Sequence, residues 1–121
     1  SPSMNVVQGV LHRSGGQAHV AAQGASWPAV PVAGGQEGQA VHYGVRPTDI
    51  TLAGVDQGIA AQVVVVEPTG AETELLVQVG EFTLVVTLHG RTDAQPGDTV
   101  YLNIDQAKTH LFDAASEQRL V

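Results

Sequence analysis

Residues 63–88 read VVVVEPTGAETELLVQVGEFTLVVTL and predict three β-strands separated by two breaks. The run Val63–Val66 is typical of a strand that is buried on both faces. Pro68 and Gly70 are expected to end this strand, because proline lacks a backbone donor and glycine tolerates left-handed angles. Gly80-Glu81 separates two further β-rich runs, and a glycine at the first central position predicts a type II′ hairpin. This part of the chain is therefore expected to be sheet core, with Val65 and Leu84 inside it.

The rest of the chain repeats the same pattern of short strands and glycine- or proline-containing turns. The strand with the valine run is expected to begin at Ile59, and Asp105 is expected to cap a short helical turn. Six other strands are predicted at Met4–Leu11, Gln17–Gln23, Trp27–Val32 (an edge strand), Ala40–Arg46, Ile50–Leu52 and Thr99–Ile104. No long helical periodicity appears, so the sequence predicts an all-β fold with little helix. A small OB-like Greek-key barrel fits the strand count better than a sandwich.

Composition limits the classes of function. The 121 residues are expected to form a single domain, 1–121, and they include no cysteine. The net charge is −7, and the five basic residues are scattered, which argues against a nucleic-acid partner. No apolar run is as long as a membrane span, and the first residues do not resemble a secretory leader. Because Met4 is internal, we expect the sequence to begin within a longer protein.

No motif for catalysis or for cofactor binding is found. The sequence has no P-loop, so this chain is not expected to bind ATP itself. It has no Gly-x-Ser-x-Gly elbow, and its five histidines lack the spacing of a zinc site. We therefore predict no catalytic, cofactor-binding or metal-binding residue in this chain, which is not expected to be an enzyme.

Four residues are candidates for a regulatory or self-association contact: Trp27, Glu67, Gly70 and Glu72. The two glutamates flank the predicted turn at residues 68–71, where side chains point off the end of the sheet. Glu74 shares a face with Glu72 if the strand begins that early, and both could simply be solvated. Trp27 has two interpretations, a core side chain that closes its proline-rich loop or an aromatic anchor for a partner.

Four segments together resemble one family. The resemblance is to the C-terminal regulatory domain, of TOBE type and OB-like, in the ATP-binding subunits of maltose- and glycerol-3-phosphate-type ABC importers. Two departures from the family pattern are Thr48, where glutamate is usual, and residues 115–117, which replace a turn glycine. The four segments are Met4–Gly9, Gly44–Ile50, Val66–Leu75, and His110–Asp113 with Arg119-Leu120.

The resemblance implies a non-catalytic module that lies behind an upstream nucleotide-binding domain, which would hold ATP and magnesium. It implies a homodimer partner in the second ATPase subunit and contact with the transporter's membrane subunits through the parent protein. It also implies a place in the cytoplasm, at the inner face of the membrane. In some members of the family this domain receives inhibitory proteins or metabolites. The loops 67–73 and 89–98 and the loop of Trp27 are the candidate contact regions.

A second interpretation is a module that binds a small oxyanion such as molybdate, because molybdate-binding domains share the TOBE architecture. Such a site needs backbone N–H groups and Ser, Thr or Lys side chains that converge on the anion. The chain is acidic and has one lysine. The sequence therefore favours the importer domain over the oxyanion site.

Overall fold

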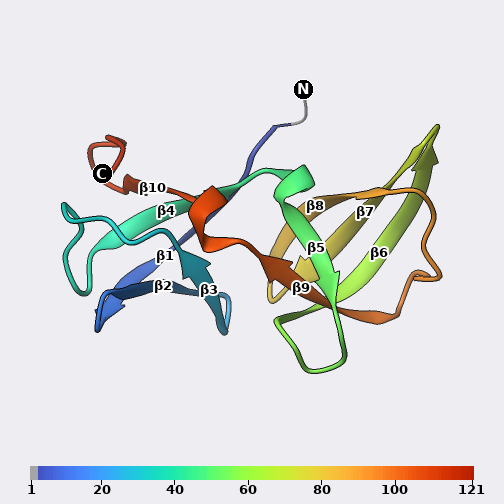
Figure 1. The fold of residues 1–121 in the computed structure, drawn as a ribbon, viewed down its shortest axis with the longest axis horizontal. Coiled ribbons are helices and arrows are strands. Elements are labelled where there is room, and N and C mark those ends of the chain that lie inside the picture. Colours follow the sequence, from blue (N-terminus) through green and yellow to red (C-terminus); the bar gives the residue numbers. More distant parts are fainter. Residues whose placement is uncertain (1–2) are drawn as a thin grey trace.

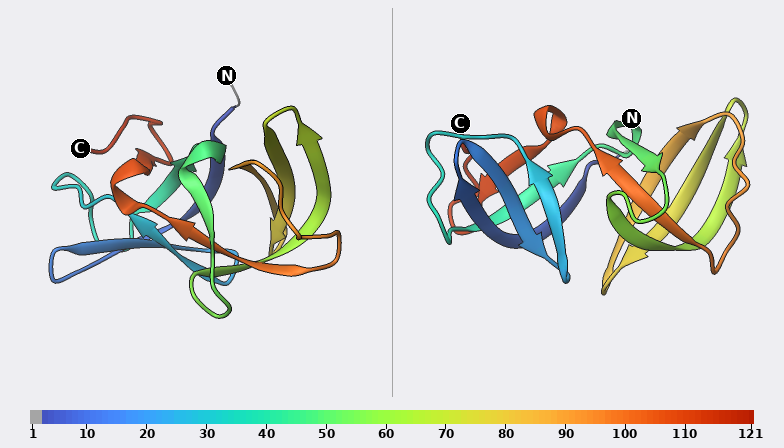
Figure 2. Two further views of the ribbon diagram at one scale, coloured as in Figure 1. Left: turned by 45° about the vertical axis from the view of Figure 1, so that its right-hand side comes forward. Right: turned by 60° about the horizontal axis from the view of Figure 1, so that its bottom comes forward.

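The structure is a computed structural model that describes residues 3–121. It contains two five-stranded antiparallel sheets that lie side by side (Figures 1 and 2). In the first sheet the order is β10-β4-β1-β2-β3, and in the second it is β5-β9-β6-β7-β8. The all-β prediction is confirmed. The first sheet comprises β1 (Asn5–Ser14), β2 (Gln17–Ala22), β3 (Ala25–Ala29), β4 (Ala40–Val45) and β10 (His110–Asp113), and the second comprises β5 (Ile50–Ala53), β6 (Ile59–Thr69), β7 (Glu72–Val79), β8 (Phe82–His89) and β9 (Thr99–Ile104).

The chain visits the first sheet twice. It builds β1 to β4, crosses to the second sheet through the 3₁₀ turn η1 (Pro47–Asp49), and completes β5 to β9 there. It then returns through η2 (Gln106–Lys108) and adds β10 beside β4 (Figure 1). The carboxylate of Asp105 accepts the backbone N–H of Ala107, which confirms the predicted cap of η2. Neither 3₁₀ turn, and no other helix in residues 3–121, has the length and apolar character needed to cross a membrane.

The predicted hairpin at Gly80-Glu81 is confirmed. Val79 pairs with Phe82, so the loop has two residues, and Gly80 has a φ of +59°. Glu81 is not in the left-handed region, and a positive φ at the first central residue alone is the mark of a type II′ turn. This turn geometry follows the twist of the flanking strands, so β7 and β8 continue directly into one another.

The alternation of apolar and polar side chains over residues 40–46 also predicts correctly which side chains of β4 are buried. Val41, Tyr43 and Val45 are fully buried, and His42 lies on the opposite face. Pro47 then follows an extended Arg46 and opens η1. The predicted edge strand at Trp27–Val32 is β3, which does lie at the edge of its sheet but covers Ala25–Ala29.

The prediction that the valine run is buried on both faces is wrong. Val63 is buried, but Val64 and Val65 are 44% and 43% exposed. The register explains the difference: Val63 pairs with Val77 and Val65 pairs with Leu76, so Val64 is an extra residue in a β-bulge. The bulge places Val65 on the outer face of the sheet. The expectation that Val65 belongs to the core is therefore also wrong, whereas Leu84, only 1% exposed, is in the core as predicted.

Pro68 does not end its strand. β6 continues to Thr69, and Pro68 pairs with Thr73 of β7. The other neighbour, β9, pairs with β6 only from Ile59 to Gln62. The far part of β6 is consequently an edge on that side, where a residue without an N–H group is tolerated.

The core is continuous between the two sheets. Trp27 of β3 is completely buried, and its ring lies edge-on against Phe82 of β8, with 6.0 Å between ring centroids. The ring also packs against Tyr43, and its Nε1 donates to the carbonyl of Ala22 at 3.0 Å. The Tyr43 hydroxyl donates to the carbonyl of Pro28 at 2.6 Å, and burial raises the pKa of Tyr43. Both polar groups of this aromatic cluster are thereby satisfied within the core.

Candidate functional site

The end of the β6–β7 hairpin carries three of the four residues that the sequence singled out: Glu67, Gly70 and Glu72. It projects from the second sheet at the end of the molecule remote from the first sheet (Figure 1). Gly70 has a φ of +67° and forms the two-residue turn with Ala71, between the paired residues Thr69 and Glu72. The left-handed angle explains the glycine at this position.

The turn is held from the side by the segment that follows β8. The N–H of Gly90 donates to the carbonyl of Ala71 at 2.7 Å. The buried hydroxyl of Thr73 donates to the carbonyl of Gly90 at 2.6 Å. These two bonds fasten the β6–β7 turn to the start of the β8–β9 connection, so the hairpin end has a defined conformation.

Arg91 completes this arrangement, and the sequence analysis did not single it out. Its guanidinium donates to the carbonyl of Gly70 at 2.8 Å and to that of Glu72 at 3.1 Å. A planar guanidinium suits two acceptors at once. Its targets are backbone carbonyls about twenty residues earlier in the chain, and no sequence motif marks such a contact.

Glu72 has one further polar neighbour. It pairs across the sheet with His89, and the closest approach of Oε2 to Nδ1 is 3.9 Å. The His89 side chain is 96% exposed, so this contact contributes little to stability. The contact places an exposed imidazole ring beside the candidate contact residues.

Glu67 has a different environment, on the outer face of the second sheet. It pairs directly with Glu74 of β7, which places two carboxylates side by side. Within residues 3–121, no Lys, Arg or His nitrogen lies within 4.0 Å of either carboxylate. Like charges at directly opposed positions destabilise a sheet. Because β7 begins at Glu72, the expectation that Glu72 and Glu74 share a face is confirmed.

A shallow hollow of about 200 Å³ adjoins these two glutamates. Val65, Leu76 and Val85 form one row across three strands, since Val65 pairs with Leu76 and Leu76 pairs with Val85. The hollow is therefore apolar in the middle and acidic at one side. Its lining consists of Val65, Glu67, Glu74, Leu75, Leu76 and Val85.

Trp27, the fourth candidate, is completely buried. Its side chain has no exposed surface, so the core interpretation is confirmed and the anchor interpretation is wrong for this conformation of the chain. The tryptophan closes the core between the sheets and offers no atoms to a partner.

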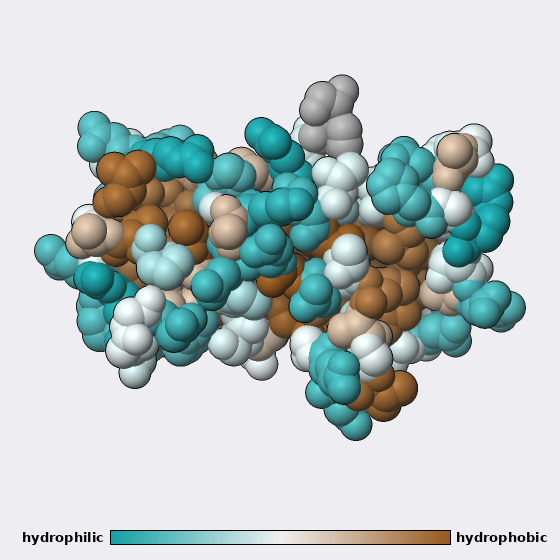
Figure 3. Space-filling view, viewed as in Figure 1, coloured by the Kyte–Doolittle hydropathy of each residue, from teal (hydrophilic) through white to brown (hydrophobic). Residues whose placement is uncertain are grey.

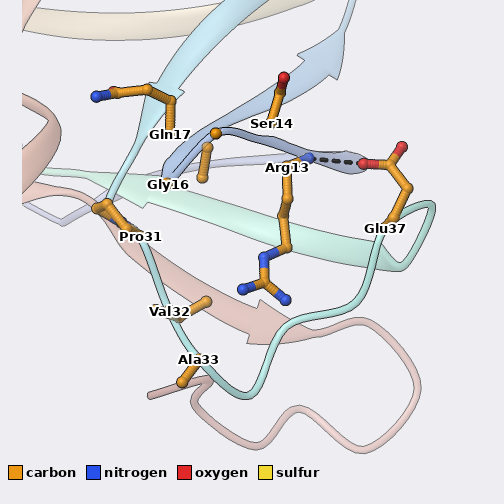
Figure 4. Close-up of a pocket in the computed structure, with 10 residues that line it drawn as sticks. Arg13, Ser14, Gly16, Gln17, Pro31, Val32, Ala33 and Glu37 are labelled. Carbon is orange, nitrogen blue, oxygen red and sulfur yellow. Dashed lines mark hydrogen bonds between the residues drawn. The ribbon is translucent and has the colours of Figure 1, made fainter.

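A second hollow, of about 350 Å³, lies beside the β1–β2 hairpin and provides a test of the oxyanion interpretation (Figure 4). Arg13 and Glu37 both line this hollow, and the N–H of Arg13 donates to Oε1 of Glu37 at 2.6 Å. The Arg13 guanidinium binds the carbonyl of Gly35, and His12 Nδ1 lies 2.6 Å from Oε2 of Glu37. The Arg13 N–H bond and the His12 contact lower the pKa of Glu37. The Arg13 N–H and His12 are thus engaged by the carboxylate of Glu37, which would repel an oxyanion, and the Arg13 guanidinium is engaged by a backbone carbonyl.

The described part of the chain holds no group of three or more His, Asp, Glu or Cys side chains arranged to bind a metal ion. The space-filling view shows polar residues over most of one face, with apolar atoms visible over both sheets (Figure 3). The loop between β5 and β6 projects from the bottom of that view and contains Val55, which is 77% exposed. A single exposed valine on a loop does not define a site.

Comparison with known proteins agrees with the architecture. The TOBE domain family matches residues 43–112. The ABC transporter ATP-binding protein y4oS of Sinorhizobium fredii is 38% identical over 123 residues, which is 99% of this chain and 32% of that protein. The sn-glycerol-3-phosphate import ATP-binding protein UgpC of Salmonella paratyphi A is 30% identical, over 99% of this chain and 34% of that protein. The sulfoquinovosyl glycerol transport ATP-binding protein SmoE of Agrobacterium fabrum is 33% identical, over 71% and 24%.

A solved structure shares the fold. The cytoplasmic molybdate-binding protein ModG, in a crystal form with molybdate bound, superimposes with a TM-score of 0.71. The match covers 88% of this chain and 94% of that chain at 17% sequence identity, so it shows the fold alone. The chain spans about a quarter to a third of the length of the ATP-binding proteins above. With more than half of its residues matched by that family, the chain belongs to the TOBE domain family.

Proposed function

We propose that this chain is the non-catalytic regulatory and dimerisation domain of the ATP-binding subunit of an ABC importer for sugars or for solutes like glycerol 3-phosphate. One observation carries the proposal: 99% of the chain aligns with about a third of an ABC transporter ATP-binding protein at 38% identity. The names of UgpC and SmoE, which refer to sn-glycerol-3-phosphate import and to sulfoquinovosyl glycerol transport, support the solute class.

In this proposal ATP and magnesium bind to a separate nucleotide-binding domain of the same subunit. The partners are a second copy of the subunit and the membrane subunits of the transporter, at the cytoplasmic face of the membrane. The sequence gives no P-loop within the 121 residues. The chain itself would then contact the second subunit and would catalyse no reaction.

The β6–β7 hairpin end is the proposed contact. Its turn is fixed by Arg91 and Thr73, while the carboxylate of Glu67 has no ionic partner among the described residues and that of Glu72 has only the long contact with the exposed His89. A rigid backbone with accessible charged side chains suits an interface, because little order has to be created on binding. Trp27 is left out of this contact because it is buried.

The proposal predicts a separation of functions. In the longer subunit, Glu72→Lys should change the ratio of transport to ATP hydrolysis without abolishing hydrolysis. Both activities are measured in reconstituted vesicles, with Glu81→Lys, an exposed charge on the β7–β8 turn, as the matched control. If Glu72→Lys and the control both retain the parental activities and ratio, the contact is not at the hairpin end.

Calorimetry on the 121-residue chain tests the non-catalytic role. Titration with Mg-ATP and, separately, with molybdate is expected to give no heat beyond dilution. Micromolar binding of ATP would contradict the regulatory assignment. Micromolar binding of molybdate would replace it with the oxyanion interpretation.

A further inference from the structure

The outer face of the second sheet combines an apolar hollow with an unneutralised pair of carboxylates. Val65, Leu76 and Val85 form the hollow's floor, and Glu67 and Glu74 stand beside it in the next cross-strand row. The bulge at Val64 is what brings this row about, because it turns Val65 away from the core. The exposed valine and the adjacent acidic pair thus have one structural cause.

The charge at this place is not balanced by any residue that the structure describes. Arg91, which holds the hairpin end, already donates to the carbonyls of Gly70 and Glu72. In the described residues, neither Glu67 nor Glu74 takes part in an ion pair. A cation supplied from outside would relieve the repulsion between the two carboxylates.

The same row contains an unsatisfied polar group. Thr87 pairs directly with Glu74, so its side chain lies on the same face of the sheet. The residue is only 8% exposed, and its hydroxyl has no hydrogen-bond partner in the described part of the chain. Buried hydroxyls normally have a partner. Glu74 therefore lies between a second carboxylate on one side and an unpaired hydroxyl on the other.

We propose that this surface binds a basic, aliphatic segment of a protein partner, with one arginine between Glu67 and Glu74 and its apolar neighbours on Val65, Leu76 and Val85. A guanidinium has enough donors to serve two carboxylates at once, and its stem can cover apolar surface. A shallow, open hollow on a sheet face suits a peptide segment better than a small molecule, which prefers an enclosed pocket. The inference rests on the proposed contact role of this end of the sheet.

The test uses the ¹⁵N-labelled 121-residue chain and NMR, without ATP or transport, so its failure leaves the importer proposal standing. The probe is the peptide acetyl-Leu-Arg-Leu-amide, compared with acetyl-Leu-Glu-Leu-amide and acetyl-Ser-Arg-Ser-amide. Saturable shifts are expected at the amides of residues 65, 74, 76 and 85 with the first peptide. Each of the other two peptides should bind more weakly, because one lacks the cation and the other lacks the apolar flanks.

Variants locate the effect. Glu67→Gln with Glu74→Gln should weaken the peptide about tenfold, the loss expected for charge-assisted hydrogen bonds. Glu81→Gln, on the distant turn, should leave the affinity unchanged. The double variant should melt no lower than the parent, since it removes a like-charge pair, and that result separates lost binding from lost folding.

Three outcomes would overturn the proposal. They are equal binding of the acidic peptide, unchanged affinity in the double variant, and shifts confined to other parts of the chain. A fourth is also decisive: if the same amides shift with protein concentration alone, the surface is occupied by a second copy of this chain and not by a basic partner.

Discussion

The side chain of Asn5 is hydrogen-bonded to both backbone groups of Val85. Its Nδ2 donates to the carbonyl oxygen of Val85 at 2.8 Å, and its Oδ1 accepts the N–H of Val85 at 2.9 Å. Asn5 begins β1 in the first sheet, and Val85 lies in β8, an edge strand of the second. The side-chain amide of Asn5 therefore makes the pair of hydrogen bonds that a neighbouring strand would make, and it joins the two sheets.

Asn5→Ala should destabilise the domain by about 1–3 kcal/mol, because both backbone groups of Val85 would lose their partners. Urea unfolding measures the loss, and hydrogen exchange at the Val85 amide should become faster. Gln8→Ala, an exposed position on the same strand, is the control and should be nearly neutral. Equal stability of the two variants would show that the link does not contribute.

Leu84→Ala and Val65→Ala should differ clearly in stability. Leu84 is buried, so its truncation leaves a cavity and should cost about 2–5 kcal/mol. Val65 is 43% exposed on the outer face, and its truncation should cost less than about 1 kcal/mol. Thermal or denaturant unfolding of both variants checks the placement of the bulge. A large loss for Val65→Ala would mean that the register of β6 is wrong.

Arg91→Ala should loosen the end of the β6–β7 hairpin without unfolding the domain. The two carbonyls of Gly70 and Glu72 would lose their common donor at an exposed place, where water can replace it. Hydrogen exchange should accelerate at residues 70–74 and not in β8. Arg91→Lys keeps the charge but lacks the planar fork, so intermediate protection is expected. If the alanine variant exchanges like the parent, the guanidinium does not hold the turn.

Asp113 predicts a specific dependence of stability on pH. The N–H of Ser116 and then the amide of Gln39 hold the pKa of Asp113 at about 2, below its usual value. The carboxylate therefore favours the folded state at pH values above the unfolded-state pKa, near 4, and this contribution disappears as the pH falls towards 2. Asp113→Asn should lower the melting temperature at pH 7, and the difference from the parent should shrink between pH 4 and 2. Asp93→Asn, in the β8–β9 connection, is the control, and a pH-independent difference would refute the assignment.

Turn chemistry made much of the fold predictable. Gly80, between two β-rich runs, predicts a turn residue with a positive φ, which the structure has. The alternation of apolar and polar side chains from Ala40 to Val45 predicts which side chains of that strand are buried. The bulge could not be predicted, since Val64 and Val65 have identical side chains and only the pairing with β7 decides which of them is extra. The prediction that Pro68 ends its strand is wrong for a related reason. Its tolerance depends on which neighbour β6 lacks at that point, and this is a property of the sheet and not of the sequence.

The candidate site was only partly predictable. Glu67, Gly70 and Glu72 were found because they surround a turn that the sequence marks with proline and glycine. Arg91 and Thr87 were missed, because each acts through a residue that is distant in the chain. For Trp27 the sequence left a core role and an anchor role open, and its complete burial against Phe82 of the other sheet decides for the core.

The return of the chain to its first sheet has a consequence for the order of folding during synthesis. β5 to β9 are contiguous, so every strand of the second sheet is available once Ile104 has left the ribosome. The first sheet has to wait for β10, which is made last and must find β4, more than sixty residues earlier. Until then one edge of β4 is unpaired and open to wrong partners. A nascent chain stalled before His110 should accordingly show a formed second sheet and a protease-sensitive first one.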